Sequence, residues 1–117
     1  MSWDVSLLYG EKEKFAQVDN CEEGGTYAIG GSTDADLNIT YNYSWFYHQC
    51  LDKKEGIDWL DGKLAKDTIP RLEKAVKVLG VRRNQDYWAD TPGNAGYALS
   101  ILLGWAKQHP DSIFEVS

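Results

Sequence analysis

The chain has 117 residues and a mass of 13.2 kDa, which fits one domain with a single hydrophobic core. Apolar residues make up 43% and charged residues 26% of the sequence, so a disordered or fibrous chain is excluded. Eighteen acidic and twelve basic side chains give a net charge of −6, which disfavours binding to DNA, RNA or an anionic membrane. No apolar run reaches the roughly 18 residues needed to span a bilayer, and no secretory signal opens the sequence, so we expect a cytosolic protein.

The charge is unevenly distributed along the chain. Residues 1–58 hold eleven acidic and four basic side chains, a net −7, whereas residues 59–117 hold seven acidic and eight basic ones, a net +1. An acidic half is typical of a solubilising surface or of a nucleic-acid mimic, and the surface is favoured because Lys12 and Lys14 interrupt the acidic row. Cys21 and Cys50 have no CxxC spacing and are too few for a disulfide framework, so neither a metal site nor a cofactor is predicted.

The first part of the chain predicts strands. A period-two pattern predicts a half-buried strand with apolar positions at Trp3, Val5, Leu7 and Tyr9. A polar turn leads from it into residues 15–18, which complete a hairpin, and glycine pairs bracket a third strand over residues 26–29. Residues 37–43 are rich in β-branched and aromatic side chains and predict another strand, which changes near Ser44 to a helix capped by Asn42 or Ser44.

The second half predicts two long helices. The first is capped by Asp67, has Pro70 in its first turn, ends at Gly80 and has apolar positions at Ile69, Leu72, Ala75, Val76 and Leu79. The second begins after Pro92, ends near His109, and has an apolar stripe of Ala95, Ala98, Leu99, Leu102, Leu103 and Ala106. Residues 113–116 predict a last strand. The sequence therefore predicts a single α+β domain over residues 1–117, with a small antiparallel sheet packed against two or three helices in two layers.

Two segments carry polar and aromatic side chains that suit a small ligand. In residues 38–44, Asn38, Thr40 and Asn42 would project from one face if a strand continued through them, and their amides and hydroxyl can read a base edge or a ribose. Tyr43 belongs to the same candidate set. The alternative is either a solvated strand face or side chains that cap neighbouring backbone.

The second segment is residues 86–96. Tyr87 and Trp88 lead into Thr91 and Asn94 at the start of the last predicted helix, where backbone N–H groups and the helix dipole favour an anion. A phosphate would bind there while one ring stacks on a base. The alternative is that Thr91 or Asn94 is only an N-cap and that the rings fill the core.

Patterns typical of catalysis are missing from the sequence. His48 and His109 lie far apart and in no nucleophile or metal pattern, and there is no GxSxG, HExxH or Walker motif. We therefore expect a protein that is not an enzyme.

Several short motifs together resemble one family. Gly24-Gly25-Thr26-Tyr27, the segment 38–44 (NITYNYS), Asp86-Tyr87-Trp88, Asn94-Ala95 and His109-Pro110-Asp111 resemble a widespread set of small proteins carried by bacteriophages and prophages. The resemblance covers nearly the whole chain. The family is largely of unknown function, and a small phage protein without an enzyme motif implies a binding protein that helps the phage in its host.

The leading hypothesis is a phage counter-defence protein that binds and sequesters a nucleotide-derived immune signal in the bacterial host cytosol. Its ligand-binding residues would be Asn38, Thr40, Asn42, Tyr43, Tyr87, Trp88, Thr91 and Asn94. The alternative is an acidic inhibitor that binds a host defence enzyme and uses the rings as interface anchors. We also expect a homo-oligomer, with Trp45, Tyr47 or Trp59 in its interface.

Overall fold

The structure, a computed structural model, describes residues 2–9, 14–16, 22–23, 26–28, 35–86 and 89–117. Its strands are β1 (Ser2–Tyr9), β2 (Lys14–Phe15), β3 (Glu22–Glu23), β4 (Thr26–Ala28), β5 (Asp36–Thr40) and β6 (Ile113–Val116). Its helices are the 3₁₀ helix η2 (Tyr41–Tyr43), α1 (Ser44–Cys50), the 3₁₀ helix η3 (Gly56–Leu60), α2 (Ala65–Leu79) and α3 (Pro92–Gln108). The expected α+β fold is confirmed.

The antiparallel sheet is built around β1. This strand pairs with β5 through residues 2–6, with β6 through residues 5–8 and with β2 at Leu8 and Tyr9. Strand β4 pairs with β5, and β3 with β4. The predicted hairpin forms between β1 and β2, although residues 17–18 of its second strand lie outside the described residues. The predicted last strand is β6, and the third predicted strand, described over residues 26–28, is β4.

The edge of β6 that faces away from β1 is covered by residues 61–64. The N–H of Phe114 donates to the carbonyl of Lys63 at 2.9 Å, and the N–H of Gly62 donates to the carbonyl of Phe114 at 2.8 Å. The N–H of Val116 donates to Oδ1 of Asp61 at 3.0 Å. Because these contacts use backbone groups that a further strand would need, they close this side of the sheet.

The two faces of the sheet differ in polarity. Val5, Leu7, Leu37 and Phe114 are buried on the face turned toward the helices. The register places polar side chains on the opposite face, where β1, β5 and β6 contribute Ser2, Asp4, Ser6, Asp36, Asn38 and Glu115. One face therefore forms the core and the other can meet water or a partner.

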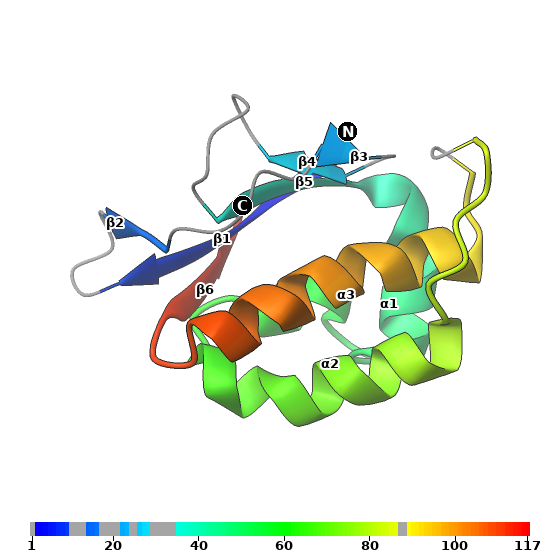
Figure 1. Ribbon diagram of the computed structural model, residues 1–117. Helices are drawn as coiled ribbons and strands as arrows, with labels where there is room; N and C mark the ends of the chain where they lie inside the picture. The colour runs from blue at the N-terminus through cyan, green and yellow to red at the C-terminus, as the bar shows by residue number, and fades with distance from the viewer. Residues whose placement is uncertain (1, 10–13, 17–21, 24–25, 29–34, 87–88) are drawn as a thin grey trace.

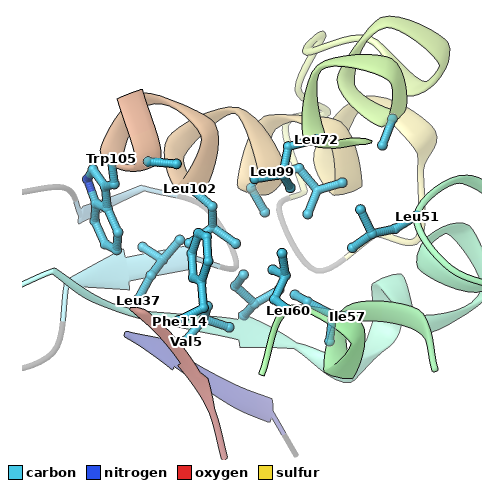
Figure 2. Close-up of a cluster of buried hydrophobic side chains, with 14 of the residues drawn as sticks. Val5, Leu37, Leu51, Ile57, Leu60, Leu72, Leu99, Leu102, Trp105 and Phe114 are labelled. Carbon is cyan, nitrogen blue, oxygen red and sulfur yellow. The ribbon is translucent and has the colours of Figure 1, made fainter. Parts of the chain in front are cut away.

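The helices gather on one side of the sheet, with α3 next to it and α2 on the far side of α3 in Figure 1. The most extensive contacts of α2 are with α3, whereas we expected each helix to pack on the sheet. Figure 2 shows one continuous core, in which Leu102 of α3 and Leu60 of η3 point toward Val5 and Phe114 of the sheet. Within the described ranges, no helix is long and apolar enough to cross a membrane.

The start of α2 differs from the prediction. The helix begins at Ala65 after Leu64, which makes no side-chain cap, so the expectation that Asp67 is the cap is wrong. The turn after α3 takes that role, because the N–H groups of Ala65 and Lys66 donate to the carbonyls of Ser112 and Pro110 at 2.8 and 3.0 Å. Asp67 lies in the first turn, and Pro70 becomes the sixth helical residue instead of a first-turn residue.

Two helix ends lie where the sequence predicted them. Gly80 follows the last residue of α2 with a φ of 77°, in the left-handed region that favours glycine. Thr91 precedes α3 as its N-cap, and Pro92 is the first helical residue. The short helix η3 has no matching pattern in the sequence.

Candidate functional site

The two predicted ligand segments meet in space, although more than forty residues separate them. The hydroxyl of Tyr47 in α1 donates to the carbonyl of Ala95 in α3 at 3.1 Å, and η2 contacts α3 directly. The carboxylate of Asp86 is close enough to Tyr43 to raise the pKa of its phenol. Figure 1 shows η2 beside the start of α3 and the loop before it. We refer to η2 together with residues 84–86 and 89–94 as the η2–α3 junction.

Tyr43 lies beneath the surface of this junction. Its side chain is almost wholly buried and packs edge-on to Tyr47, with 6.3 Å between the ring centroids. Burial first, and then the negative charge of Asp86, raise the pKa of Tyr43 to about 12. The phenol therefore remains protonated at neutral pH and can both donate and accept a hydrogen bond.

Tyr47 is a core residue. It is fully buried, and burial followed by the proximity of Tyr43 raises the pKa of its phenol well above the usual value. The expectation that Tyr47 is one of the surface rings of an oligomer interface is therefore wrong. Its position in α1, four residues after Tyr43, places both rings on the helix face that turns inward.

Two predicted ligand residues of β5 bind their own chain. The side-chain nitrogen of Asn38 donates to Oγ of Ser2 at 2.7 Å and to Oδ1 of Asp4 at 2.9 Å, across the pair of strands. Thr40 is buried, and its hydroxyl oxygen accepts the N–H of Asn42 at 3.3 Å, which caps η2. Because β5 ends at Thr40, Asn42 does not continue the expected strand face; it is exposed in η2.

Asn94 organises the loop that precedes α3. Only 4% of the residue is exposed. Its side-chain oxygen accepts the N–H of Asn84 at 2.9 Å, and its side-chain nitrogen donates to the carbonyls of Asp86 and Ala89 at 3.1 and 3.0 Å. The contacts of this amide therefore hold the backbone on both sides of residues 87–88.

The first turn of α3 offers fewer anion-binding groups than expected. Pro92 has no N–H, and the N–H groups of Asn94 and Ala95 donate to the hydroxyl and the carbonyl of Thr91 at 3.2 and 3.1 Å. Thr91 is thus the N-cap, which the sequence left open as the alternative. A phosphate at this helix start remains a prediction.

The segment 80–82 packs directly on that first turn. A Cβ at Gly93 would clash with the carbonyl oxygen of Arg82, and one at Gly96 would clash with the carbonyl oxygen of Gly80. The Gly-x-x-Gly spacing of Gly93 and Gly96 is the sequence signal for this close approach. Arg82 is exposed beside the junction, and the guanidinium of Arg83 lies 4.6 Å from the ring centroid of Tyr97. The two rings predicted to stack, Tyr87 and Trp88, lie outside the described residues.

A group of aromatic rings extends from η2 of the junction onto α1 and β1. Trp45 is 66% exposed and Tyr41 40% exposed, and the half-buried Phe46 and Trp3 support them. The ring of Trp45 packs edge-on to Phe46 at 5.2 Å, and that of Tyr41 lies 4.6 Å from Trp3. We call these four residues the aromatic surface. Trp59, also expected at an interface, lies elsewhere, with Arg71 and Lys63 over its ring at 4.1 and 4.8 Å.

A shallow hollow of about 530 Å³ lies on another part of the surface, lined by His48, Lys54, Glu55, Asp58 and Asp61. The backbone of Gly56 packs against the imidazole of His48, since a Cβ at this glycine would lie 2.9 Å from Nε2 of that ring. In the part of the chain that the structure describes, no group of three or more histidine, cysteine or acidic side chains suits a metal ion. The residues that line this hollow come from α1, from the turn after it, from η3 and from the residue that follows η3, so no single sequence pattern predicts it.

The polar face of the sheet is acidic. Strands β1, β5 and β6 contain Asp4, Asp36 and Glu115 and no lysine or arginine. Ser6 donates to Oδ1 of Asp36 at 2.9 Å, which fixes one of these carboxylates. Asp4 and Asp36 belong to the acidic half of the sequence, whereas Glu115 comes from the other half. No protein-family model, curated protein or solved structure matches the chain.

Proposed function

We propose that the protein is a non-enzymatic binding protein that sequesters a nucleotide-derived immune signal at the η2–α3 junction. One observation carries the proposal: the fold brings together two segments that were identified separately as ligand-binding, with Tyr43 of one beside Asp86 of the other. The setting is that of the phage family which the sequence resembles, in the cytosol of a bacterial host.

The contacts at the junction divide the candidate residues into two groups. Asn38, Thr40, Thr91 and Asn94 use their side chains to bind the protein's own backbone or neighbouring strands, so we assign them to building the site. Asn42, Tyr87 and Trp88 are assigned to the ligand, and the buried Tyr43 to the floor of the site. The side chain of Asn42 is exposed, and its amide has the donor and acceptor groups that suit a base or ribose.

Stacking and charge complete the proposed site. Tyr87 and Trp88 follow Asp86 directly in the sequence, and either ring would stack on a base, a contact that contributes about 1–3 kcal/mol. The backbone of Arg82 packs against Gly93 in the first turn of α3, and its side chain is exposed. Its guanidinium is the group we assign to a phosphate, since the α3 start has few donors left for one.

Thermal unfolding of the purified protein with cyclic dinucleotides, cyclic ADP-ribose isomers and mononucleotides tests the proposal. A ligand present at a hundred times its dissociation constant should add about 2.7 kcal/mol of stability. Recovery of the ligand intact after denaturation would distinguish sequestration from hydrolysis. A panel without any shift would overturn the proposal.

Matched variants then locate the site. Asn42→Ala and Trp88→Ala should each weaken binding of the ligand found in the panel, measured by calorimetry. Trp59→Ala is the control, because its ring lies with Arg71 and Lys63 away from the junction and should leave the affinity unchanged. Equal affinity of all three variants and the wild type would place the ligand elsewhere.

The acidic face of the sheet favours a second candidate function, the inhibition of a host enzyme through its basic site. Asp4, Asp36 and Glu115 lie on strands without any basic residue, and so suit a positively charged surface. A complex of this kind should weaken strongly as the salt concentration rises, whereas a stacked nucleotide should respond less. Asp4→Asn combined with Glu115→Gln should weaken the protein complex and leave nucleotide binding unchanged.

A further inference from the structure

Three of the four residues of the aromatic surface lie in a stretch of sequence without charged side chains, and the fourth, Trp3, packs against Tyr41 from β1. Residues 37–51 contain no aspartate, glutamate, lysine or arginine, although charged residues make up 26% of the sequence. This stretch supplies β5, η2 and α1, and among the described residues its Trp45 and Tyr41 are the exposed large aromatic side chains. From this combination we infer that the aromatic surface is where two copies of the chain associate, around a twofold axis.

The absence of charge selects a second copy over a charged partner. Each chain has a net charge of −6, so two copies repel each other wherever their carboxylates would face. At residues 37–51 they can approach without opposing like charges. A strongly basic or acidic partner would be recognised through countercharges, and this stretch has none to offer.

The composition of the surface is that of an interface core. Tryptophan and tyrosine are enriched at the centres of protein interfaces, where charged residues are depleted. Beside the rings, the exposed side chain of Gln49 contains a donor and an acceptor. Because the same group can pair with its own copy, this amide suits a twofold interface in which one patch meets itself.

The supporting rings hold the surface in place before any partner binds. Trp3 packs at 4.6 Å from Tyr41 and at 5.9 Å from the buried Tyr47, which anchors it to the core. Phe46 supports Trp45 from the side. Side chains that are already ordered lose less conformational entropy on association, so an interface formed by them is more stable for its size.

This inference does not depend on a nucleotide ligand, because it concerns the free protein. Analytical ultracentrifugation over a wide range of protein concentrations measures it directly. We expect a species of twice the chain mass that dissociates on dilution. Trp45→Ala should raise the dimer dissociation constant by about tenfold or more, as for a central tryptophan of an interface.

A charge pair tests the twofold geometry. Trp45→Glu and Trp45→Lys should each be monomeric alone, because the axis places equal charges near each other, and an equimolar mixture of the two should form dimers again. Val78→Glu is the control, since Val78 is 65% exposed on α2, as exposed as Trp45, and should leave dimerisation unchanged. Circular dichroism of each variant checks that the fold is retained.

Three results would overturn the inference. The first is a wild-type protein that remains monomeric at every concentration, including the case in which it binds a different protein through Trp45. The second is a dimer that Trp45→Glu leaves intact. The third is a dimer that Val78→Glu disrupts as strongly as Trp45→Glu does.

Discussion

The side chain of Asn94 accepts the backbone N–H of Asn84 at 2.9 Å, across ten residues of sequence. The same side chain donates to the carbonyls of Asp86 and Ala89, which flank residues 87–88. A single amide therefore fixes both ends of the segment that contains the two candidate stacking residues. Any substitution that disturbs Asn94 changes the geometry of the junction before it changes a ligand contact.

Asn94→Ala should lower the free energy of unfolding by about 1–3 kcal/mol, because three backbone groups lose their partner and the residue is buried. Urea denaturation measures the change. Asn42→Ala is the matched control, since this amide is exposed, and we expect it to alter stability by no more than about 0.5 kcal/mol. Equal stability of Asn94→Ala and the wild type would contradict the assigned role.

Gly93→Ala and Gly96→Ala should each destabilise the protein by about 3 kcal/mol or prevent folding, because the new methyl group would clash with the backbone carbonyl of Arg82 or Gly80. Gly104→Ala lies in the same helix with open space around its Cβ, and should stabilise the protein by up to about 1 kcal/mol. Thermal and urea unfolding of the three variants gives the comparison. Similar effects at all three glycines would show that segment 80–82 does not pack on α3.

Tyr43 should make the protein lose stability at alkaline pH. An unfolded chain releases the phenolic proton near pH 10.0, whereas the folded protein holds it until about pH 12. Below this range both states are protonated and the stability is fully present; as pH rises through it, the unfolded state gains from ionisation first. Tyr43→Phe cannot ionise, so its stability should fall less steeply than that of the wild type. If the free energies of unfolding of Tyr43→Phe and the wild type change in parallel across this pH range, the raised pKa of Tyr43 is refuted.

Asp52 should contribute stability at neutral pH and lose it in acid. Its carboxylate accepts the N–H groups of Glu55 and Lys54 at 2.7 and 3.1 Å and pairs with Arg71 at 3.2 Å, and these contacts lower its pKa from the usual 3.8, with the Glu55 bond as the largest cause. The stabilisation is present above the unfolded pKa and disappears as pH falls through the lowered folded pKa.

Asp52→Asn should therefore be less stable than the wild type near neutral pH, and the difference should narrow as the solution becomes acidic. Asp111→Asn removes the same charge from another exposed position, outside this set of contacts, and serves as the control. A difference between Asp52→Asn and the wild type that stays constant down to low pH would show that the contacts do not depend on the charge.

The sequence predicted those elements whose residues repeat with a simple period. Helix α3 begins and ends as predicted because its apolar stripe, the cap at Thr91 and the break at Pro110 are local signals. The alternation in β1 predicted a strand in the same way. Helix α2 began earlier than predicted because its first N–H groups bind residues 110–112, a contact that no local pattern encodes.

The sequence identified the two segments of the candidate site, but not the role of each side chain or the contact between the segments. Asn38 and Asn94 have the side chains that a ligand site needs, but the same groups serve equally well to tie two strands or to hold a loop. Which role they take depends on the residues that the fold places beside them. The meeting of residues 38–44 with residues 86–96 likewise follows from the packing of α1 on α3, which the sequence pattern does not contain.

The covered edge of β6 limits how this protein can meet other molecules. With its outward N–H groups already bound by Lys63 and Asp61, β6 cannot template a guest strand, and neither an extended peptide nor a second sheet can be added there. Recognition on that side has to work through side chains. Copies of the chain that pair through Trp45 therefore cannot extend their assembly by adding strands at this edge.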